Sequence, residues 1–337
     1  MKIQELARNL IEINTFCSWV YDVFCSTLFY KNFINKKIKN RLEYINNHKN
    51  LKFIIETTSI CNAKCAFCPY STMDRQHIPM SDEIFNKIIE RLKEEQIKPV
   101  LFDLFLIGEP FLDKKIFERI KILKEDFPDV PVNITSNFNI CDEEIINKII
   151  TSDINLIYIS LNAVNEKKYK ELMGLDYKKT VKNINNLIKS KKKYKKNLKI
   201  NLSMVLYEED SFLDKLKFFF SWVFKVDSLR FQRAVTWHNK IKIKNTISKK
   251  EKILYPCNDL FERIPILSNG DFALCCQDSE GMINLNIMDT GIIQAWNSNV
   301  YSKIRKIHLD KELNDFELCK NCFGTNSNGA NWIFIDR

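Results

Sequence analysis

The sequence lacks an uninterrupted apolar run long enough to span a bilayer. Its apolar-rich early segment, residues 10–30, contains Glu12 and Asp22, so a transmembrane helix is not expected there. No secretory leader is recognised either, whereas cysteine is plentiful, with eleven residues. So many thiols without a leader indicate a reducing compartment in which they bind metals and do not form disulfides. We therefore expect a cytoplasmic protein.

Acidic residues are the minority among the charged ones. The chain has 42 Asp and Glu against 52 Lys and Arg, which leaves a net charge of +10. Its lysine-rich blocks, 189–196 and 240–244, lack the interleaved aromatic residues of a single-strand nucleic-acid binder. We interpret these blocks as solvated surface, and no nucleic-acid partner is expected.

Residues 1–50 are expected to form an N-terminal helical segment. Apolar residues such as Phe16, Trp19 and Val23 recur at helical intervals, which predicts an amphipathic helix that packs on the main domain. Because five basic residues follow between positions 31 and 41, attachment to a membrane surface is the alternative.

Residues 51–240 alternate between short apolar runs and amphipathic stretches, which is a β/α pattern. Six strands are predicted, at 51–57, 100–107, 130–136, 155–161, 198–205 and 226–232. Residues of the N-cap type predict helix starts at Ser81, Asp113, Asp142, Asn165 and Asp176. The alternation alone is compatible with a partial barrel, a full barrel or a doubly wound sheet.

Three cysteines, Cys61, Cys65 and Cys68, lie within eight residues directly after the first predicted strand. Soft thiolates in such a group favour iron–sulfur clusters or zinc. Three protein ligands also leave one coordination position free for a ligand that is not protein. A zinc knuckle is the structural alternative.

The spacing Cys-x3-Cys-x2-Cys, with Phe67 before the third cysteine and Pro69 after it, resembles the signature of the radical SAM enzymes. In that family the thiolates hold a [4Fe-4S] cluster whose fourth iron binds S-adenosylmethionine (SAM). Cleavage of SAM yields a 5′-deoxyadenosyl radical that takes a hydrogen atom from the substrate. The resemblance implies an α/β fold, the partial (β/α)6 TIM barrel of the family, and an electron donor such as flavodoxin or ferredoxin.

Polar residues follow several of the predicted strands, where parallel α/β folds place their ligands. Gly108-Glu109-Pro110 resembles the family's GGEP motif, whose backbone receives the SAM amino group, although Ile107 stands where the first glycine often is. Asn137 follows the third strand, and the serine at the end of the fourth commonly meets the ribose hydroxyls in the family. The resemblance thus implies cofactor-binding roles for Phe67, Gly108, Glu109, Pro110, Asn137 and Ser160.

The last two predicted strands add further polar candidates. Asn201 and Ser203 are two apart and so share one face of a strand. Arg230 and Arg233 could bind a carboxylate or a phosphate. Because they are three apart, at most one of them lines the interior.

Residues 250–337 are expected to form a small cysteine-rich α+β domain. Asn269-Gly270 predicts a hairpin over 264–275, which places thiols beside Cys257. Because adjacent residues in a strand face opposite sides, only one of Cys275 and Cys276 should join a metal centre. With the knuckle at 319–322, the candidate ligands are Cys257, one of Cys275 and Cys276, Cys319 and Cys322. A structural zinc site is the alternative.

This cysteine pattern resembles the C-terminal SPASM or shorter twitch domains of radical SAM enzymes, which carry auxiliary [4Fe-4S] clusters. The intervals of eighteen, forty-four and three between the four cysteines are similar to those of the single-cluster type in 2-deoxy-scyllo-inosamine dehydrogenase. That similarity selects Cys275 over Cys276. Four thiolates leave no open iron, so the resemblance implies a second, auxiliary [4Fe-4S] cluster that transfers electrons.

The sequence therefore predicts a radical SAM oxidoreductase that oxidises a small hydroxylated substrate such as a sugar or aminocyclitol. A SPASM-type maturase that modifies a ribosomally made peptide is the second hypothesis. The segment before the first strand is too short for the usual peptide-recognition domain, which favours the small molecule. A non-enzymatic metal-binding protein is the third.

Overall fold

The structure is a computed structural model that describes residues 28–194, 196–207, 210–234, 237, 240–241, 257–310 and 316–320. Most of the helix expected at 10–30 lies outside the described residues, and so does Cys322. Within the described part of the chain, no helix combines the length and the apolar character needed to cross a membrane.

Seven parallel strands form one sheet, in the order β6-β5-β4-β3-β2-β1-β7. The strands are β1 (Lys52–Ile55), β2 (Leu101–Leu104), β3 (Val132–Ser136), β4 (Leu156–Ser160), β5 (Lys199–Leu206), β6 (Ser228–Arg233) and β7 (Arg263–Ile266). All six strands predicted from the sequence are confirmed. The seventh comes from the cysteine-rich C-terminal part of the chain and pairs with β1.

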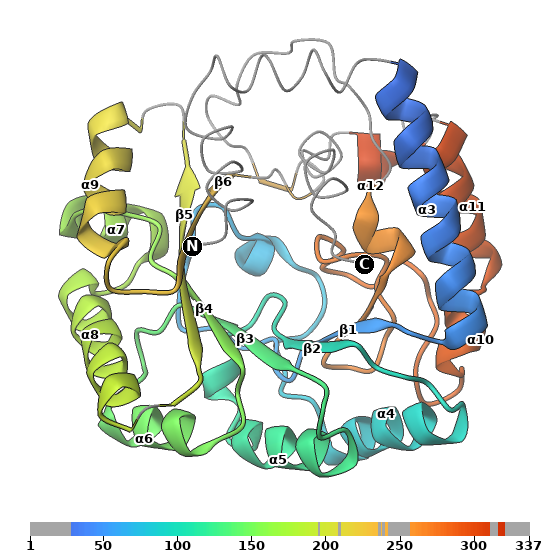
Figure 1. Ribbon diagram of the computed structural model, residues 1–337, viewed down its shortest axis with the longest axis horizontal. Coiled ribbons are helices and arrows are strands. Elements are labelled where there is room, and N and C mark those ends of the chain that lie inside the picture. The colour runs from blue at the N-terminus through green and yellow to red at the C-terminus, as the bar shows by residue number, and fades with distance from the viewer. Residues whose placement is uncertain are drawn as a thin grey trace.

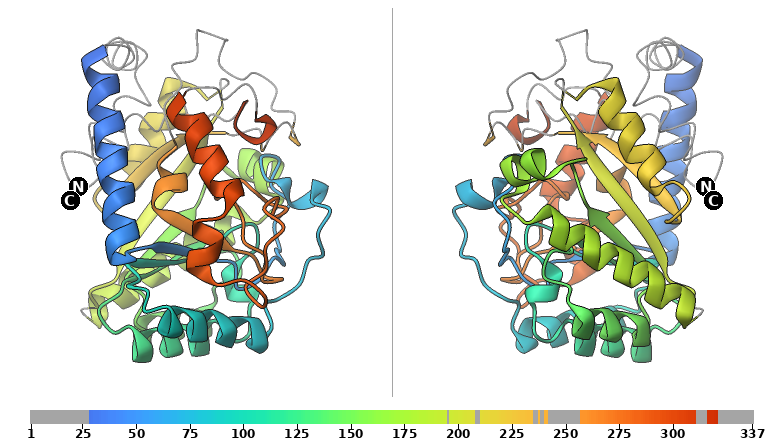
Figure 2. Two further views of the ribbon diagram at one scale, coloured as in Figure 1. Left: turned by 90° about the vertical axis from the view of Figure 1, so that its right-hand side faces the viewer. Right: turned by 90° about the vertical axis from the view of Figure 1, so that its left-hand side faces the viewer.

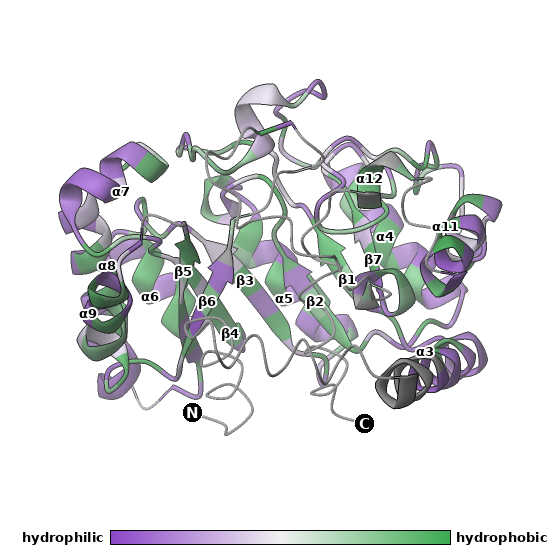
Figure 3. Cartoon of the chain, turned by 90° about the horizontal axis from the view of Figure 1, so that it is seen from above, coloured by the Kyte–Doolittle hydropathy of each residue, from purple (hydrophilic) through white to green (hydrophobic). Residues whose placement is uncertain are grey.

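Helices cover the outside of the sheet, as Figures 1 and 3 show. The α-helices are α3 (Leu28–His48), α4 (Asp82–Glu94), α5 (Ile116–Asp126), α6 (Glu143–Thr151), α7 (Glu166–Met173), α8 (Tyr177–Lys193), α9 (Phe212–Trp222), α10 (Ile292–Trp296), α11 (Asn299–Asp310) and α12 (Glu317–Lys320). The short 3-10 helices are η1 (Pro69–Thr72), η2 (Pro110–Leu112) and η3 (Asn258–Phe261).

Four of the five predicted helix starts are N-caps whose side chains accept a backbone N–H: Ser81, Asp142, Asn165 and Asp176. The prediction at Asp113 was wrong, because α5 begins only at Ile116. Asp113 instead ends η2 and accepts the backbone N–H of Lys115 at 2.9 Å. An Asx turn between two helices therefore imitates an N-cap in the sequence.

The two faces of the sheet differ in chemistry. The outer face carries side chains such as Phe53, Phe102, Ile134 and Ile157, all 0% exposed, which pack with the helices in one core. The pairing register places the alternate residues together on the inner face. These residues are largely polar: Asp103, Asn133, Thr135, Tyr158, Ser160, Asn201, Ser203, Arg230 and Gln232.

The sheet curves but does not close, since among the described residues β6 has β5 as its single neighbour and β7 forms the other edge. Figure 1 shows this arc with α4, α5, α6 and α8 on its convex side. The predicted partial barrel is confirmed, and the full barrel is excluded. Helices on one face also exclude a doubly wound sheet.

Helix α3 packs beside the C-terminal helices, as the side views in Figure 2 show. The indole N–H of Trp296 in α10 donates to Asn46 of α3 at 3.2 Å, and Arg41 lies 4.0 Å from the buried carboxylate of Glu262. The described end of the N-terminal segment thus contacts the part of the chain that carries the second cysteine group.

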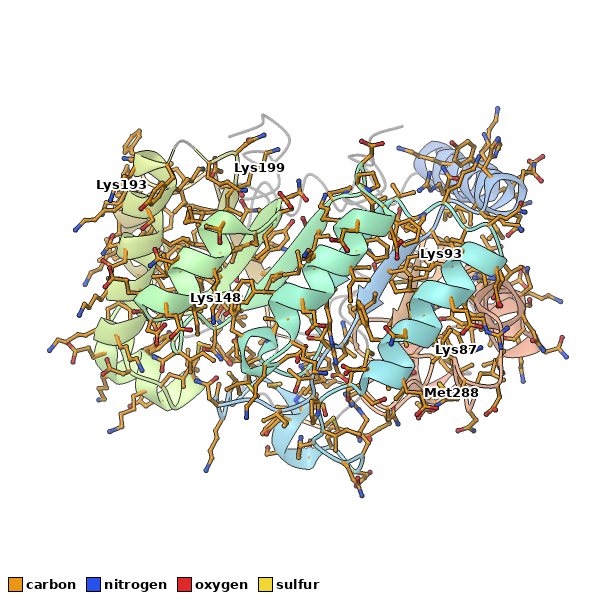
Figure 4. The ribbon with its side chains drawn as sticks, turned by 90° about the horizontal axis from the view of Figure 1, so that it is seen from below. Lys87, Lys93, Lys148, Lys193, Lys199 and Met288 are labelled. Carbon is orange, nitrogen blue, oxygen red and sulfur yellow. The ribbon has the colours of Figure 1, made fainter. Side chains whose placement is uncertain are left out.

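Lysines on the outer helices point into solvent. Figure 4 shows Lys93, Lys148 and Lys193 projecting from α4, α6 and α8, and all three are exposed. Lys148 pairs with Glu144 at 2.6 Å, an ordinary surface contact. The interpretation of the block at 189–196 as solvated surface fits this arrangement.

Candidate active site

The first cysteine group lies on a loop directly after β1, and its three thiols are each partly buried. The loop is held by its own backbone, since the amide of Cys68 donates to the carbonyl of Cys65 at 3.1 Å. The amide of Ala63 points at Cys61 Sγ at 3.4 Å, and the amide of Cys61 donates to the hydroxyl of Tyr70 at 3.3 Å. The thiols are therefore carried by an ordered turn.

Helix α7 anchors the middle of this loop. The amide of Lys64 donates to the carbonyl of Met173 at 3.0 Å, and that of Ala66 donates to Leu172 at 2.8 Å. Both acceptors are in the last turn of α7, where helical carbonyls lack partners within the helix. Gly174 ends the helix at φ +68°, a left-handed conformation that glycine adopts without strain. The C-terminus of α7 thus serves as the platform for the cysteine loop.

The protein environment of these thiols disfavours negative charge. Burial raises the pKa of Cys61 to about 12 and that of Cys68 to about 11, and it raises the pKa of Cys65 as well. Repulsion among the thiolates and from Glu109 adds to the pKa shift of Cys65. Three thiolates can persist together here only with a cation bound between them, so their chemistry fits a metal cofactor.

The three cysteines suit a [4Fe-4S] cluster by their chemistry. In such a cluster each thiolate binds a different iron, and three protein thiolates leave the fourth iron without a protein ligand. The residues present thus fit the predicted [4Fe-4S] group.

The turn Gly108-Glu109-Pro110 packs directly against the start of the cysteine loop. The amide of Glu109 donates to the carbonyl of Ile60 at 2.9 Å. A Cβ atom at position 108 would lie 2.0 Å from the carbonyl oxygen of Thr58, so only glycine fits. Pro110 then begins η2 and turns the chain away. The glycine is needed because two backbones meet here.

The carboxylate of Glu109 joins the ends of β2 and β3. It accepts the amides of Phe111 and Asn137 at 3.2 and 2.7 Å and the hydroxyl of Ser136 at 2.8 Å. Burial raises the pKa of Glu109 to about 7, although the three donors oppose the shift. Its side chain therefore positions the turn, while the backbone of the turn remains the group predicted to meet SAM.

Asn137 lies against the cysteine loop. Its side-chain amide donates to Asn62 at 2.8 Å and lies 4.0 Å from Cys61 Sγ. Its carbonyl oxygen accepts the amide of Asn139 at 3.0 Å. The structure thus brings together the cysteine loop, the Gly-Glu-Pro turn and the end of β3.

The structure gives the positions of the two remaining predicted residues, Ser160 and Phe67. Ser160 ends β4 on the inner face, and the pairing register aligns it with Ser203 of β5 and Arg230 of β6. The backbone carbonyl of Phe67 accepts the indole N–H of Trp237 at 2.7 Å. Its ring lies 6.4 Å from that of Tyr207 in an edge contact.

Sequence reasoning missed a buried ion pair that joins both cysteine-bearing parts. Glu56, 0% exposed, follows β1 and pairs with Arg75 at 2.6 Å. Its carboxylate also accepts the amides of Ile107 and Ser268, at 3.2 and 3.0 Å. An acidic residue at the end of a buried strand was the available signal, but its partners are up to 212 positions away.

Two members of the second cysteine group, Cys257 and Cys319, meet at one histidine. Cys257 precedes η3, Cys319 lies in α12, and His308 of α11 contacts both: its Nδ1 accepts the amide of Cys257, and its Nε2 lies 3.2 Å from Cys319 Sγ. The fourth predicted ligand, Cys322, is outside the described residues.

The Asn269-Gly270 turn is present, with Gly270 at φ +87°, but the arm that returns from it is not a strand. After one antiparallel bridge, between Ile266 and Phe272, the chain enters a turn at Cys275 and Cys276. The reason given for separating these two cysteines, the alternating faces of a strand, was therefore wrong. Their environments still differ, because the thiol of Cys276 donates to Asp259 at 3.3 Å, whereas Cys275 Sγ accepts the amide of Gln277 at 3.4 Å.

An open parallel barrel with three thiols at the carboxyl end of its first strand defines the radical SAM class. A model of the radical SAM superfamily matches residues 55–219, and a model of the SPASM iron–sulfur cluster-binding domain matches residues 257–323. The chain therefore belongs to the radical SAM superfamily and carries a SPASM domain. These domains imply a [4Fe-4S] cluster, SAM and auxiliary iron–sulfur binding.

Several solved structures share this fold. BtrN in complex with AdoMet and 2-DOIA has 16% identity and a TM-score of 0.53, covering 80% of this chain and 92% of BtrN. Streptococcus suis SuiB bound to precursor peptide SuiA has 17% identity and a TM-score of 0.62, and the match covers 79% of this chain and 70% of SuiB. Native anSMEcpe with bound AdoMet and the Cp18Cys peptide has 18% identity and a TM-score of 0.57, and the match covers 85% of this chain and 96% of anSMEcpe. At such identities the likeness concerns the fold.

Two curated relatives match over shorter regions. The uncharacterized protein MJ0804 of Methanocaldococcus jannaschii is 32% identical over 127 residues, which are 36% of this chain and 38% of that protein. The probable GTP 3′,8-cyclase of Methanococcus vannielii is 28% identical over 138 residues, 40% of this chain and 44% of that protein. The chain thus spans less than half the length of either relative.

Proposed function

We propose that this radical SAM enzyme is an oxidoreductase that dehydrogenates a small hydroxylated molecule, such as a sugar or an aminocyclitol. The observation that carries the proposal is the polar inner face of the sheet beside the cysteine loop. Hydroxyl, amide and guanidinium groups face inward from β3 to β6, where an oxygen-rich substrate could exchange hydrogen bonds with them.

The residues around the first cysteine group suit the roles that the family resemblance implies. Cys61, Cys65 and Cys68 would hold the cluster, and the backbone at Gly108 would receive the SAM amino group. When bound, the two clusters and SAM supply a 5′-deoxyadenosyl radical and an acceptor for a second electron. The chain itself orients the substrate and excludes water. An external donor such as flavodoxin or ferredoxin would supply the reducing electron.

Arg230 is the proposed contact for an oxygen-rich substrate. It stands on the inner face two strands from Ser160, about 10 Å away at the usual strand spacing. Its Nε is buried, and no hydrogen-bond partner for that nitrogen exists among the described residues. An unpaired buried donor costs about 1–3 kcal/mol. A hydroxyl, carboxylate or phosphate oxygen of the substrate would remove that cost.

The electron-accepting role fits the second cysteine group. Loss of a hydrogen atom from a carbon that bears a hydroxyl, followed by loss of one electron and the hydroxyl proton, gives a carbonyl. This reaction needs an electron acceptor, which four protein thiolates without an open iron would suit. A reducing compartment, the cytoplasm, suits both the clusters and the eleven cysteines.

The alternative is a maturase that modifies a ribosomally made peptide. The observation in its favour is the open edge of the sheet at β6, which in the described part of the chain has no neighbour beyond β5. An extended substrate could enter along such an edge. SuiB and anSMEcpe, whose structures contain peptides, share the fold.

Isotope transfer tests the proposal directly. The anaerobically reconstituted protein is incubated with SAM, a reductant and panels of deuterated sugars, aminocyclitols and peptides. We expect deuterium in 5′-deoxyadenosine, together with a carbonyl product, from a sugar or aminocyclitol. The variant Arg230→Met should raise KM at least about tenfold, which corresponds to about 1.4 kcal/mol, whereas Lys148→Met on exposed α6 should not. Deuterium transfer from peptides alone would refute the small-molecule assignment.

A further inference from the structure

Helix α11 has no cysteine, yet its buried face contacts the segments of three predicted auxiliary-cluster ligands. The hydroxyl of Tyr301 donates to the carbonyl of Ala273 at 2.6 Å, two residues before Cys275. The Nε of Arg305 donates to the carbonyl of Leu260 at 2.8 Å, three residues after Cys257. These contacts place α11 as a common support for segments that lie far apart in the sequence.

The helix is itself firmly held. The Nη1 of Arg305 donates to the carbonyl of Trp296 at 2.8 Å, and its guanidinium lies 3.8 Å from the centre of the Trp296 ring. Tyr301 and His308 are both 0% exposed. His308 is three residues beyond Arg305 and therefore on the same helical face. Its ring is thus fixed by a packed helix and not by a loop.

The contacts of His308 define where its proton lies. Its Nδ1 accepts the backbone N–H of Cys257 at 3.2 Å. A backbone amide can only donate, so Nδ1 carries no proton and the neutral ring must carry it on Nε2. That Nε2 lies 3.2 Å from the sulfur of Cys319. His308 therefore presents an N–H to Cys319 while it holds the backbone of Cys257.

We propose that His308 is a positioning residue for the auxiliary cluster. It sets the relative placement of Cys257 and Cys319, and its Nε2–H···S hydrogen bond to Cys319 raises the reduction potential of the cluster. The inference rests on the proposed function in one respect, the assignment of these two cysteines as cluster ligands. Reduction adds negative charge to a cluster and its thiolates, so a hydrogen bond to a ligand sulfur stabilises the reduced form. A higher potential favours acceptance of the substrate electron.

The test measures the potential of the auxiliary cluster alone. Full-length chains carrying Cys61→Ala, Cys65→Ala and Cys68→Ala are reconstituted anaerobically, so the remaining cluster signal belongs to the second site. Potentiometric titration monitored by electron paramagnetic resonance then compares the reduction potential of the auxiliary cluster in the chain with His308 and in two variants at that position. His308→Leu removes both hydrogen bonds, whereas His308→Gln can accept with its oxygen and donate with its amide. Lys306→Gln, on the exposed side of α11, is the matched control.

We expect His308→Leu to shift the potential to a more negative value, His308→Gln to restore most of the shift, and Lys306→Gln to change nothing. An unchanged potential in a His308→Leu chain with full iron content would overturn the inference. If the His308→Leu chain fails to bind iron, the hydrogen bond is tested in the chain that retains His308. Pulsed electron paramagnetic resonance on that chain, labelled with [15N]histidine, measures the coupling of histidine nitrogen to the cluster. A weak nitrogen coupling that is lost in His308→Gln supports the hydrogen bond, and a strong coupling typical of an iron ligand, or no coupling at all, contradicts it.

These outcomes can be separated from failure of the proposed function. Substrate identity and deoxyadenosine formation do not enter the titration, so a peptide substrate would leave the His308 result standing. A triple-alanine chain that binds no iron after anaerobic reconstitution would overturn the ligand assignment and, with it, the role of His308.

Discussion

Replacement of Glu56 is expected to unfold the link between the two cysteine-bearing parts of the chain. The Glu56 carboxylate is completely buried and accepts from Arg75, Ile107 and Ser268. Glu56→Ala leaves the guanidinium of Arg75, whose side chain is 8% exposed, without its counter-charge. Breaking a buried pair in this way costs about 3–5 kcal/mol. Each orphaned amide adds a cost of about 1–3 kcal/mol, although these costs are not additive.

A loss of this size is a large part of the stability of an ordinary domain, which is about 5–15 kcal/mol. Glu56→Gln is the milder test, because its oxygen can still accept from Arg75 and Ile107 while its NH2 group faces the amide of Ser268. It should lose less stability than Glu56→Ala. Arg75→Ala combined with Glu56→Ala should cost less than the sum of the two single changes, since both remove the same pair.

The assay is guanidinium-induced unfolding of the metal-free chain, followed by circular dichroism. The control is Glu90→Gln, which removes the exposed ion pair between Glu90 and Lys87, 2.9 Å long. It should change the free energy of unfolding by less than about 0.5 kcal/mol. If Glu56→Ala stays within about 1 kcal/mol of the unaltered chain, the ion pair does not hold the two parts together, since loss of a buried partner should cost about 3 kcal/mol or more.

Three further changes probe the site. Gly108→Ala places a Cβ 2.0 Å from the Thr58 carbonyl oxygen, so the turn must shift, and SAM cleavage should fall about 100-fold; unchanged cleavage would contradict the close contact. Burial raises the pKa of Glu109 from 4.5 to about 7, so its contribution to the stability of the metal-free chain should decline by about 3 kcal/mol as pH rises between these values. Unfolding curves of Glu109→Gln should lack that decline. Trp237→Phe removes the 2.7 Å hydrogen bond from the indole to the Phe67 carbonyl and should weaken SAM binding about fivefold in calorimetry. Equal affinity for SAM would show that Trp237 does not support the cofactor site.

The alternating part of the fold was readable from the sequence because its signals are local. Apolar runs of strand length mark β1 to β6, and caps such as Ser81 and Asp142 satisfy amides three residues ahead. The cysteine spacing after β1 was equally local. Each of these features depends on residues that lie within one turn or one strand of each other.

Long-range partners could not be read in this way. The parallel pairing of β7 with β1 joins positions more than 200 apart, and a short apolar segment such as Arg263–Ile266 fits a hairpin equally well. His308 looks like an isolated surface histidine until the fold places it between Cys257 and Cys319. Tertiary contact, and not residue type, gives such positions their roles.

The proposed function depends first on Cys61, Cys65 and Cys68, which we expect to support radical cleavage of SAM. The most direct measurement is 5′-deoxyadenosine formed from SAM by the anaerobically reconstituted chain, alongside the triple alanine variant and Cys141→Ala, a buried cysteine outside both groups. We expect deoxyadenosine from the unaltered chain and from Cys141→Ala, and none from the triple variant. Formation by the triple variant at the unaltered rate, or no formation by a fully iron-loaded chain, would contradict that expectation.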